Sequence, residues 1–288
     1  MGNWGRWGTE DEAGSLNLLT ARTVLAAMGQ VRHGRVISLA QPLGPGITVA
    51  PHRTKPQRFM NRDGGDYAAG ARSPDGFRFA EDTVQLASHS GTHLDALSHA
   101  WTGDQLYNGH PASSVRSTHG AARCGADKLA PIVTRGLLVN LVDAHGGPLP
   151  ASYPVGVDEL SAACRAAGFT PGTSDAVLIR TGWWERHRGH PDYHDHEPGL
   201  SADAAAWLAE RDIALAGADN YALEVQPSPP GTTFPAHLVL LHQYGIPILE
   251  NLDLRELAAT GARTFLFVAA PLPLQGSTAS PIAPLAIL

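Results

Sequence analysis

The chain of 288 residues lacks a long apolar run, a block of basic residues and more than two cysteines. No stretch approaches the roughly 18 apolar residues of a membrane helix, and the first residues, MGNWGRWGTEDEAG, contain no apolar signal segment. The formal net charge of −6 and the scattered basic residues exclude the cationic surface that nucleic acids require. We therefore expect a soluble, cytoplasmic protein without nucleic-acid or membrane partners.

The two cysteines, Cys124 and Cys164, form neither a metal-type pair nor a disulfide framework. Such sparse cysteine usage fits a reducing compartment. We expect both side chains to pack as small apolar residues.

The chain shows no internal repeat, no low-complexity tract and no shift in composition that would mark a linker. With 43% hydrophobic residues it can build a sizeable core, and we predict a single domain over residues 1–288. One stretch differs from the rest, because residues 51–77 are polar and rich in turn-forming residues. We expect a long surface excursion there, or a lid over a site.

Short apolar, β-branched segments alternate with helical patterns along the chain. The predicted helices are residues 157–168, residues 201–212 with Ser201 as N-cap, and residues 235–245 with a proline in the first turn and a closing glycine. The alternation indicates an α/β protein with a mixed sheet and flanking helices, although the pattern does not give the number of sheets. The predicted strands are residues 82–88, 136–142, 176–181, 213–218, 246–251 and 264–270.

Three histidines and one aspartate fall within eleven residues, ASHSGTHLDALSHAW, as His89, His93, Asp95 and His99. Divalent transition metals favour imidazole and carboxylate ligands, and open catalytic sites use about three of them. A turn at Gly91 would let His93 return toward His89, and His93 and Asp95 share a face of an extended chain. If residues 94–101 begin a helix, His99 lies one turn past Asp95 and hangs over the metal without binding it. The alternative is four unrelated polar residues, each bonded to backbone.

Other residues leave more than one interpretation open. The histidines of residues 187–196 lie among prolines, glycines and mixed charges, which is typical of a solvated loop. Trp183 and Trp184 suit a ligand pocket, a core or a subunit interface equally. Glu224 is a candidate buried carboxylate of unknown role. The sequence contains no nucleophile elbow, P-loop or dinucleotide-binding fingerprint.

The segment HSGTHLDALSH, from His89 to His99, resembles the HxGTHxDxPxH signature of the cyclase family of metal-dependent hydrolases, which includes bacterial kynurenine formamidase and isatin hydrolase. Leu97 replaces the signature proline, which changes the stiffness of the backbone but removes no ligand. The resemblance covers nearly the whole chain, because further segments are similar to the family: WGTEDEAGSLNLL, LYNG, VLIRTGW, AGADNYALE and HLVLLHQYGIPILENLDL.

The resemblance implies a swivelling β/β/α fold, a homodimer or homotetramer, and one or two divalent ions, Zn²⁺ or Mn²⁺, held by His89, His93 and Asp95. A second ion would share Asp95 and take His237 and Glu250. Helical spacing places His242 about 140° away from His237, so only one of the two can face the site. A structural salt bridge is the alternative role for Glu250.

The function that the resemblance implies is hydrolysis of an amide, lactam or formamide C–N bond, as in an aryl-formamide or isatin, with His99 as general base and acid beside a metal-activated water. The alternatives are a polyketide-type cyclase or dehydratase, in which His99 enolises the substrate, and a metal-holding protein without activity. For an aromatic substrate we expect a pocket lined by some of Trp101, Phe77, Met60 and Trp183, with Trp184 next to Trp183 as a further candidate.

Overall fold

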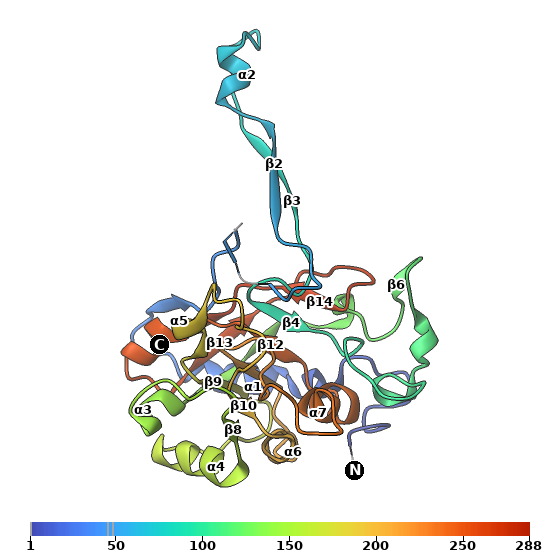
Figure 1. Cartoon of the computed structure of the whole chain (residues 1–288), viewed down its shortest axis with the longest axis vertical. Helices are drawn as coiled ribbons and strands as arrows, with labels where there is room; N and C mark the ends of the chain where they lie inside the picture. Colours follow the sequence, from blue (N-terminus) through green and yellow to red (C-terminus); the bar gives the residue numbers. More distant parts are fainter. Residues whose placement is uncertain (1, 45, 48) are drawn as a thin grey trace.

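The computed structural model describes residues 2–44, 46–47 and 49–288, and their main element is a nine-stranded mixed sheet (Figure 1). The predicted fold class, α/β with a mixed sheet and flanking helices, is confirmed. In spatial order the strands are β1 (Val36–Ser38), β15 (Leu285–Ile287), β13 (Thr264–Ala269), β7 (Ile132–Asn140), β9 (Ala176–Arg180), β11 (Leu215–Ala218), β12 (Ile248–Glu250), β4 (His93–Asp95) and β14 (Ala279–Pro281).

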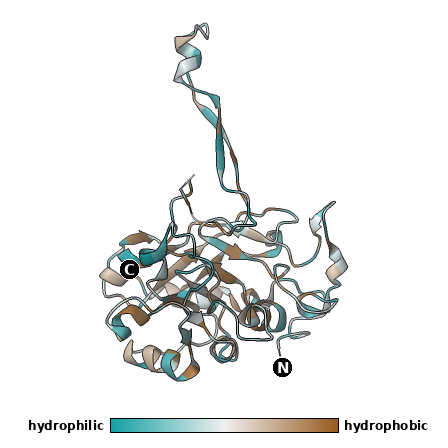
Figure 2. Cartoon of the chain, in the orientation of Figure 1, coloured by the Kyte–Doolittle hydropathy of each residue, from teal (hydrophilic) through white to brown (hydrophobic). Residues whose placement is uncertain are grey.

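The centre of the sheet is parallel, and both of its faces are buried. Strands β7, β9, β11 and β12 run parallel to one another, which explains their nearly continuous apolar sequences (Figure 2). Alternate residues of these strands enter two separate cores: Val177 and Ile179 of β9 face one, whereas Leu178 faces the other. The sheet therefore separates two apolar cores, and the ends of its strands lie between these cores.

Helices cover both faces of the sheet. The first core contains buried residues of α4 (Val157–Ala166), α6 (Ala202–Ala209), α7 (Pro235–His237) and the π-helix η5 (Leu238–Tyr244). Helix α1 (Ala21–Met28) contacts β7 and β13, and α8 (Arg255–Ala259) contributes Leu257 to the second core. The predicted cap is confirmed, because the Ser201 hydroxyl accepts a hydrogen bond from the Ala204 backbone at 3.2 Å.

The third predicted helix starts and ends as expected, but most of it is a π-helix. Pro235 occupies its first turn, and Gly245 ends it with a left-handed φ of +63°. A π-helix has wider i→i+5 turns than an α-helix, and such segments occur frequently at functional sites. The α-helical spacing used to separate His237 from His242 was therefore wrong, although the two side chains do diverge.

The predicted strand over residues 82–88 exists as β3 (Glu81–Gln85), but it does not belong to the central sheet. It pairs with β2 (Gln57–Arg62), and α2 (Gly64–Ala68) lies at the far end of this hairpin. Figure 1 shows the hairpin projecting away from the body of the molecule. Most of the predicted surface excursion is thus an extended arm, whereas its first residues, His52 and Arg53, line a hollow beside His99 and His237.

The remaining elements are short. Both cysteines are buried and free, as expected. Among the described residues, none of the helices has the length and apolar character needed to cross a membrane. The short elements are β5 (Val115–Arg116), β6 (Gly120–Ala121), β8 (Pro154–Val155), β10 (Gly199–Leu200), α3 (Leu141–His145), α5 (Trp183–His187) and the 3₁₀ turns Gly14–Leu18, Tyr107–Gly109, Ala112–Ser114 and Ala126–Lys128.

Candidate metal centre

Strand pairing brings the motif together with a distant carboxylate. Strand β4 lies between β12 and β14 and is antiparallel to both, so that His93 stands opposite Glu250. Because side chains alternate along a strand, His93 and Asp95 share one face, while Leu94 enters the core on the other. The sheet thus places three ligand-type side chains on one surface, although Glu250 is 157 residues from His93 and 155 from Asp95 in the sequence.

The turn before β4 is held tightly. Gly91 has a φ of +60°, and a Cβ there would lie 2.6 Å from the side chains of Leu43 and Ile47. The Thr92 hydroxyl donates to the Asn251 carbonyl at 2.6 Å and accepts from the Gln41 backbone at 2.8 Å. Thr92 therefore stabilises the turn, and the structure gives it no contact with a ligand-type side chain.

His89 and His93 each have one ring nitrogen near a polar neighbour and the other near a carboxylate. His93 Nδ1 donates to the Gly91 carbonyl at 2.8 Å, and its Nε2 lies 3.1 Å from Glu250 Oε2 and 3.5 Å from Asp95 Oδ1. His89 Nε2 lies 3.0 Å from the Thr278 hydroxyl, and its Nδ1 lies 2.8 Å from Asp95 Oδ1. A carbonyl only accepts, so the His93 tautomer leaves Nε2 free as a ligand.

His99 reaches the centre without a helix. The predicted helix over residues 94–101 was wrong, because β4 is followed by a turn in which the His99 backbone donates to the Ala96 carbonyl at 2.9 Å. The His99 ring nevertheless lies 4.1 Å from the ring of His89 and 6.0 Å from that of His237, measured between centroids. It thus belongs to the cluster, and its ligand atom lies within 4.8 Å of those of His89 and Asp95.

His237 joins the centre from the opposite side, held by Glu224. Its Nε2 lies 3.3 Å from Glu250 Oε1 and 3.8 Å from Asp95 Oδ2. Its Nδ1 donates to Glu224 Oε1 at 2.6 Å, and the backbone N–H groups of Ala236 and His237 donate to the same carboxylate. A carboxylate behind a histidine is the arrangement that orients metal ligands in proteins. The sequence indicated that Glu224 is buried but not which residue it contacts.

The buried polar atoms fit a divalent cation. His89 Nδ1, His93 Nε2 and both carboxylate oxygens of Asp95 are buried, and within the described part of the chain they face one another and Glu250 without the geometry of regular hydrogen bonds. Atoms of His89, Asp95 and His99 lie within 4.8 Å of one another, as do those of His93, Asp95 and Glu250. An unpartnered buried carboxylate is costly, whereas a cation would satisfy it. The two groups share Asp95, so the geometry accommodates one ion or two.

Burial and neighbouring charges shift the pKa values of His93, His237 and His99 in different directions. Burial opposes protonation of His93 and His237, but neighbouring carboxylates raise the pKa of His93 to about 9 and that of His237 to about 10. Burial lowers the pKa of His99 to about 4, although Asp95 opposes the shift. His99 is therefore a neutral imidazole at pH 7, able to accept a proton.

His242 and the histidines of residues 187–196 lie outside the two ligand groups. His242 Nε2 bonds to the Gln105 carbonyl at 3.0 Å, and its ring meets Trp4 edge-on. His242 is buried there, away from the centre. In the loop at residues 187–196, His187 stacks on Trp183 and His194 meets the ring of Tyr221 edge-on. No group of metal-ligand geometry is found in this loop, all of which the structure describes.

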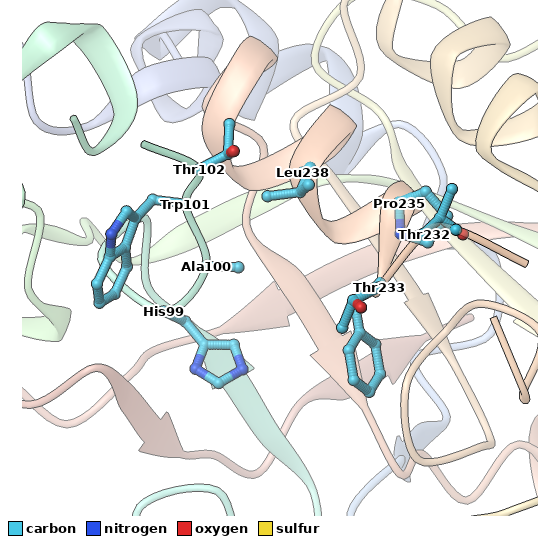
Figure 3. Close-up of a pocket in the computed structure, with 10 residues that line it drawn as sticks. His99, Ala100, Trp101, Thr102, Thr232, Thr233, Pro235 and Leu238 are labelled. Carbon is cyan, nitrogen blue, oxygen red and sulfur yellow. The ribbon is translucent and has the colours of Figure 1, made fainter. Parts of the chain in front are cut away.

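A pocket of about 580 Å³ opens beside His99 (Figure 3). His99 and Trp101 form one wall, and residues 231–235 with Leu238 form the other. A second hollow of about 250 Å³ contains His99, His237 and Glu250 together with Arg53 and Tyr221. The Arg53 guanidinium donates to the His89 carbonyl at 2.8 Å and lies over the Tyr221 ring. Neither Arg53 nor Tyr221 carried a sequence signal for this position.

Three of the four predicted pocket residues do not line the pocket of their own chain. Trp101 does so and is 38% exposed. Trp183 is buried in a small aromatic core with Trp184 and Tyr193, and its indole N–H donates to the Tyr193 carbonyl. Met60 and Phe77 lie on the projecting arm, where they are 45% and 62% exposed. Aromatic character alone did not distinguish these surroundings.

We expect Glu224→Gln to lower the affinity for Mn²⁺ or Zn²⁺ about 10- to 100-fold, because an amide holds the His237 imidazole less strongly than a carboxylate does. Equilibrium dialysis of the metal measures the change. Glu185→Gln is the control, since Glu185 pairs with Arg180 away from the centre. Equal affinities in the wild type and the Glu224 variant would contradict this role.

The α/β fold and a buried histidine–carboxylate cluster beside a pocket define a candidate metalloenzyme. A family model described as "Putative cyclase" matches residues 37–225, and the chain belongs to this cyclase family. An isatin hydrolase of Roseibium aggregatum is 30% identical over 224 residues, which is 74% of this chain and 77% of that protein.

Solved structures share the fold. The crystal structure of a novel cyclase superposes with a TM-score of 0.93 at 33% identity and covers 100% of both chains. Isatin hydrolase A from Labrenzia aggregata, bound to benzyl benzoate, has a TM-score of 0.66 at 22% identity and covers 93% of this chain and 98% of its own. The second likeness concerns the fold alone.

Proposed function

We propose that the protein is a metal-dependent hydrolase that cleaves a non-peptide C–N bond in an amide, lactam or formamide. The observation that carries the proposal is the pair of ligand groups that share Asp95, one with His89 and His99 and the other with His93 and Glu250, beside an open pocket. The 30% identity with an isatin hydrolase over three-quarters of the chain supports the reaction class. An aryl-formamide or an isatin-like lactam is the proposed substrate, and the cytoplasm is the proposed location.

The proposed ligands are His89, His93 and Asp95 for one ion, and Asp95, His237 and Glu250 for a second. Zn²⁺ and Mn²⁺ both suit this set of imidazoles and carboxylates. A bound divalent ion supplies Lewis acidity, which polarises a carbonyl group and lowers the pKa of a coordinated water from about 15.7 toward 7. Glu224 and the Gly91 carbonyl hold the ligand imidazoles of His237 and His93 in the required orientation.

The residues around this centre transfer protons and bind the substrate. His99 lines both hollows, so a ring nitrogen can accept a proton from the attacking water and return it to the leaving nitrogen. Trp101 and Phe234 provide apolar surface for an aromatic ring. Arg53, already oriented by the His89 carbonyl and Tyr221, also lines the smaller hollow, where its guanidinium can donate to a bound carbonyl oxygen.

We expect the protein loaded with Zn²⁺ or Mn²⁺ to turn over at least one N-formyl aniline or aromatic lactam. Turnover should be lost when a chelator removes the metal. In ¹⁸O-labelled water, hydrolysis transfers one labelled oxygen to the carboxylate product, as mass spectrometry shows. A product closed into a ring without label would favour the cyclase alternative. Tight ligand binding without turnover across the panel would favour a binding protein.

A further inference from the structure

The carboxyl end of β7 carries a polar side chain that lies away from the metal centre. Asn140 is the last residue of β7, and it stands opposite Arg180, the last residue of the parallel strand β9. Strands β9 and β11 lie between β7 and β12, which ends at the candidate ligand Glu250. In open α/β sheets, ligands bind outside the carboxyl ends of the strands. The end of β7 is therefore a second place where this sheet can hold a ligand.

The side-chain amide of Asn140 presents a donor that no described residue accepts. The Arg180 guanidinium donates to Asn140 Oδ1 at 3.2 Å, and the Asp143 backbone N–H donates to the same oxygen at 3.4 Å. Because both neighbours only donate, the atom that faces them is the oxygen, which fixes Nδ2 as the free donor. Asn140 is only 8% exposed, and its Nδ2 is buried without a hydrogen-bond partner. A buried N–H group without an acceptor costs free energy, which an oxygen atom of a ligand would offset.

Arg263 adds a second buried donor beside Asn140. Its Nη2 donates to Asp143 Oδ2 at 3.1 Å, whereas its Nη1 is buried and makes no hydrogen bond within the described part of the chain. Asn140, Asp143 and Arg263 all line one hollow of about 240 Å³. Among the described residues that line this hollow, the only acidic side chain is that of Asp143, which already pairs with Arg263. Two free donors, one of them cationic, favour a negatively charged acceptor such as a carboxylate or phosphate oxygen.

A larger cavity of about 730 Å³ shares Arg263 with this hollow, and its size suits a small organic molecule. Arg32, His33 and Arg35 line the cavity, whereas none of the described residues that line it has a carboxylate side chain. The side chains of Arg32 and His33 make no hydrogen bond or ion pair with a described residue, and Arg35 pairs with a glutamate of α8. The backbone oxygen of Leu288, another lining residue, accepts from two backbone N–H groups. The cavity therefore extends the positive surface of the smaller hollow.

We propose that these two hollows together bind a small organic molecule through a carboxylate or phosphate group, which Asn140 and Arg263 hold at the end of β7. The rest of the molecule lies in the larger cavity, where Arg32 and His33 are free to contact it. Figure 1 shows α3 and α4, which border the smaller hollow, well away from β4. The site shares no lining residue with the two hollows beside His99, so its ligand is not the substrate and the inference does not depend on the proposed function.

The first test is isothermal titration calorimetry with phosphate and acetate, and with phenyl phosphate and benzoate as larger probes, in buffer without added metal. We expect saturable binding of at least one of the two anion classes in the millimolar range, and tighter binding of its aryl form, because the ring enters the larger cavity. Binding of phosphates alone would indicate a phosphate ester as the ligand, and binding of carboxylates alone a carboxylic acid. No saturable binding of any probe, or equal affinities for the simple anions and their aryl forms, would overturn the proposal.

Two variants locate the bound probe. Asn140→Asp keeps an acceptor for Arg180 but replaces the free donor by a carboxylate oxygen, and Arg263→Gln removes the cation. We expect each variant to weaken binding at least about tenfold with an unchanged circular dichroism spectrum, since a charge-assisted hydrogen bond contributes a factor of this size. Asn61→Asp and Arg58→Gln, at exposed positions on the arm, make the same changes of charge and should bind as the wild type does. An unchanged affinity in either site variant would place the anion elsewhere and overturn the proposal.

Protection from phenylglyoxal provides a measurement on the wild-type chain. This reagent modifies accessible guanidinium groups, and the Arg263 side chain is 34% exposed. We expect the bound probe to slow modification of Arg263 but not of Arg58, as mass spectrometry of the peptides shows. Equal rates at Arg263 with and without the probe would contradict binding at this site. Because none of these measurements reads turnover, their failure is distinguishable from failure of the proposed function.

Discussion

We expect His93→Ala to abolish metal retention and hydrolysis together. His93 is fully buried, and its Nε2 faces both Asp95 and Glu250, so its loss removes a ligand from the middle of the cluster. It also leaves two buried carboxylates without their shared imidazole, which favours their protonation over cation binding. Elemental analysis after gel filtration should find about one ion per wild-type chain or more, and close to none in the variant.

Thermal unfolding gives an independent measure of the same change. A ligand at about 100 times its dissociation constant stabilises the folded state by about 2.7 kcal/mol, so added Mn²⁺ or Zn²⁺ should raise the wild-type Tm by several degrees. The Tm of His93→Ala should not respond. His242→Ala is the matched control, because His242 is buried outside the centre, and it should retain the metal. Equal metal contents in the wild type and His93→Ala would contradict the assignment of the site.

We expect His99→Ala to reduce turnover and to retain the metal. His99 lines both hollows as a neutral imidazole, and a positioned general base or acid typically contributes about 10²- to 10⁴-fold in rate. We expect a loss of this size in kcat, with the ion content of the wild type. The measurement is a comparison of steady-state kinetics and elemental analysis on one preparation of each variant.

The same variant distinguishes proton transfer from ligation. His99 lies close enough to His89 and Asp95 to serve as a ligand itself. If His99→Ala lost one ion along with its activity, His99 would be a metal ligand, and the general base would have to be sought elsewhere. Retained metal together with unchanged kcat would remove His99 from the reaction altogether.

The part of the site that lies within one short segment could be predicted from the sequence, because residue spacing and turn-forming residues act between near neighbours. His89, His93, Asp95 and His99 lie within eleven residues, and the turn at Gly91 determines how they approach one another. Longer strands such as β7, β9 and β13 were predicted for the same reason, since their apolar runs are several residues long. The strands β1, β4, β14 and β15 have three residues each, too few for a periodic pattern.

Residue type predicted the pocket poorly. Trp101 and Trp183 are both tryptophans, yet one lines the open pocket and the other lies in a closed aromatic core. Arg53 lies in a stretch whose polarity indicated a surface excursion, but its guanidinium reaches the His89 carbonyl. Exposure and contact depend on which elements pack together, and composition carries no information about that packing.

The sequence by itself determined the α/β class, the eleven-residue ligand motif and, through the family resemblance, His237 and Glu250 as candidate ligands. Only the tertiary structure decided that β12 lies beside β4 with Glu250 opposite His93, that Glu224 holds His237, and that residues 57–85 project as an arm. The physical reason is sequence separation. Turn geometry and side-chain alternation act between near neighbours, whereas strand order and helix packing are selected by the burial of the whole core.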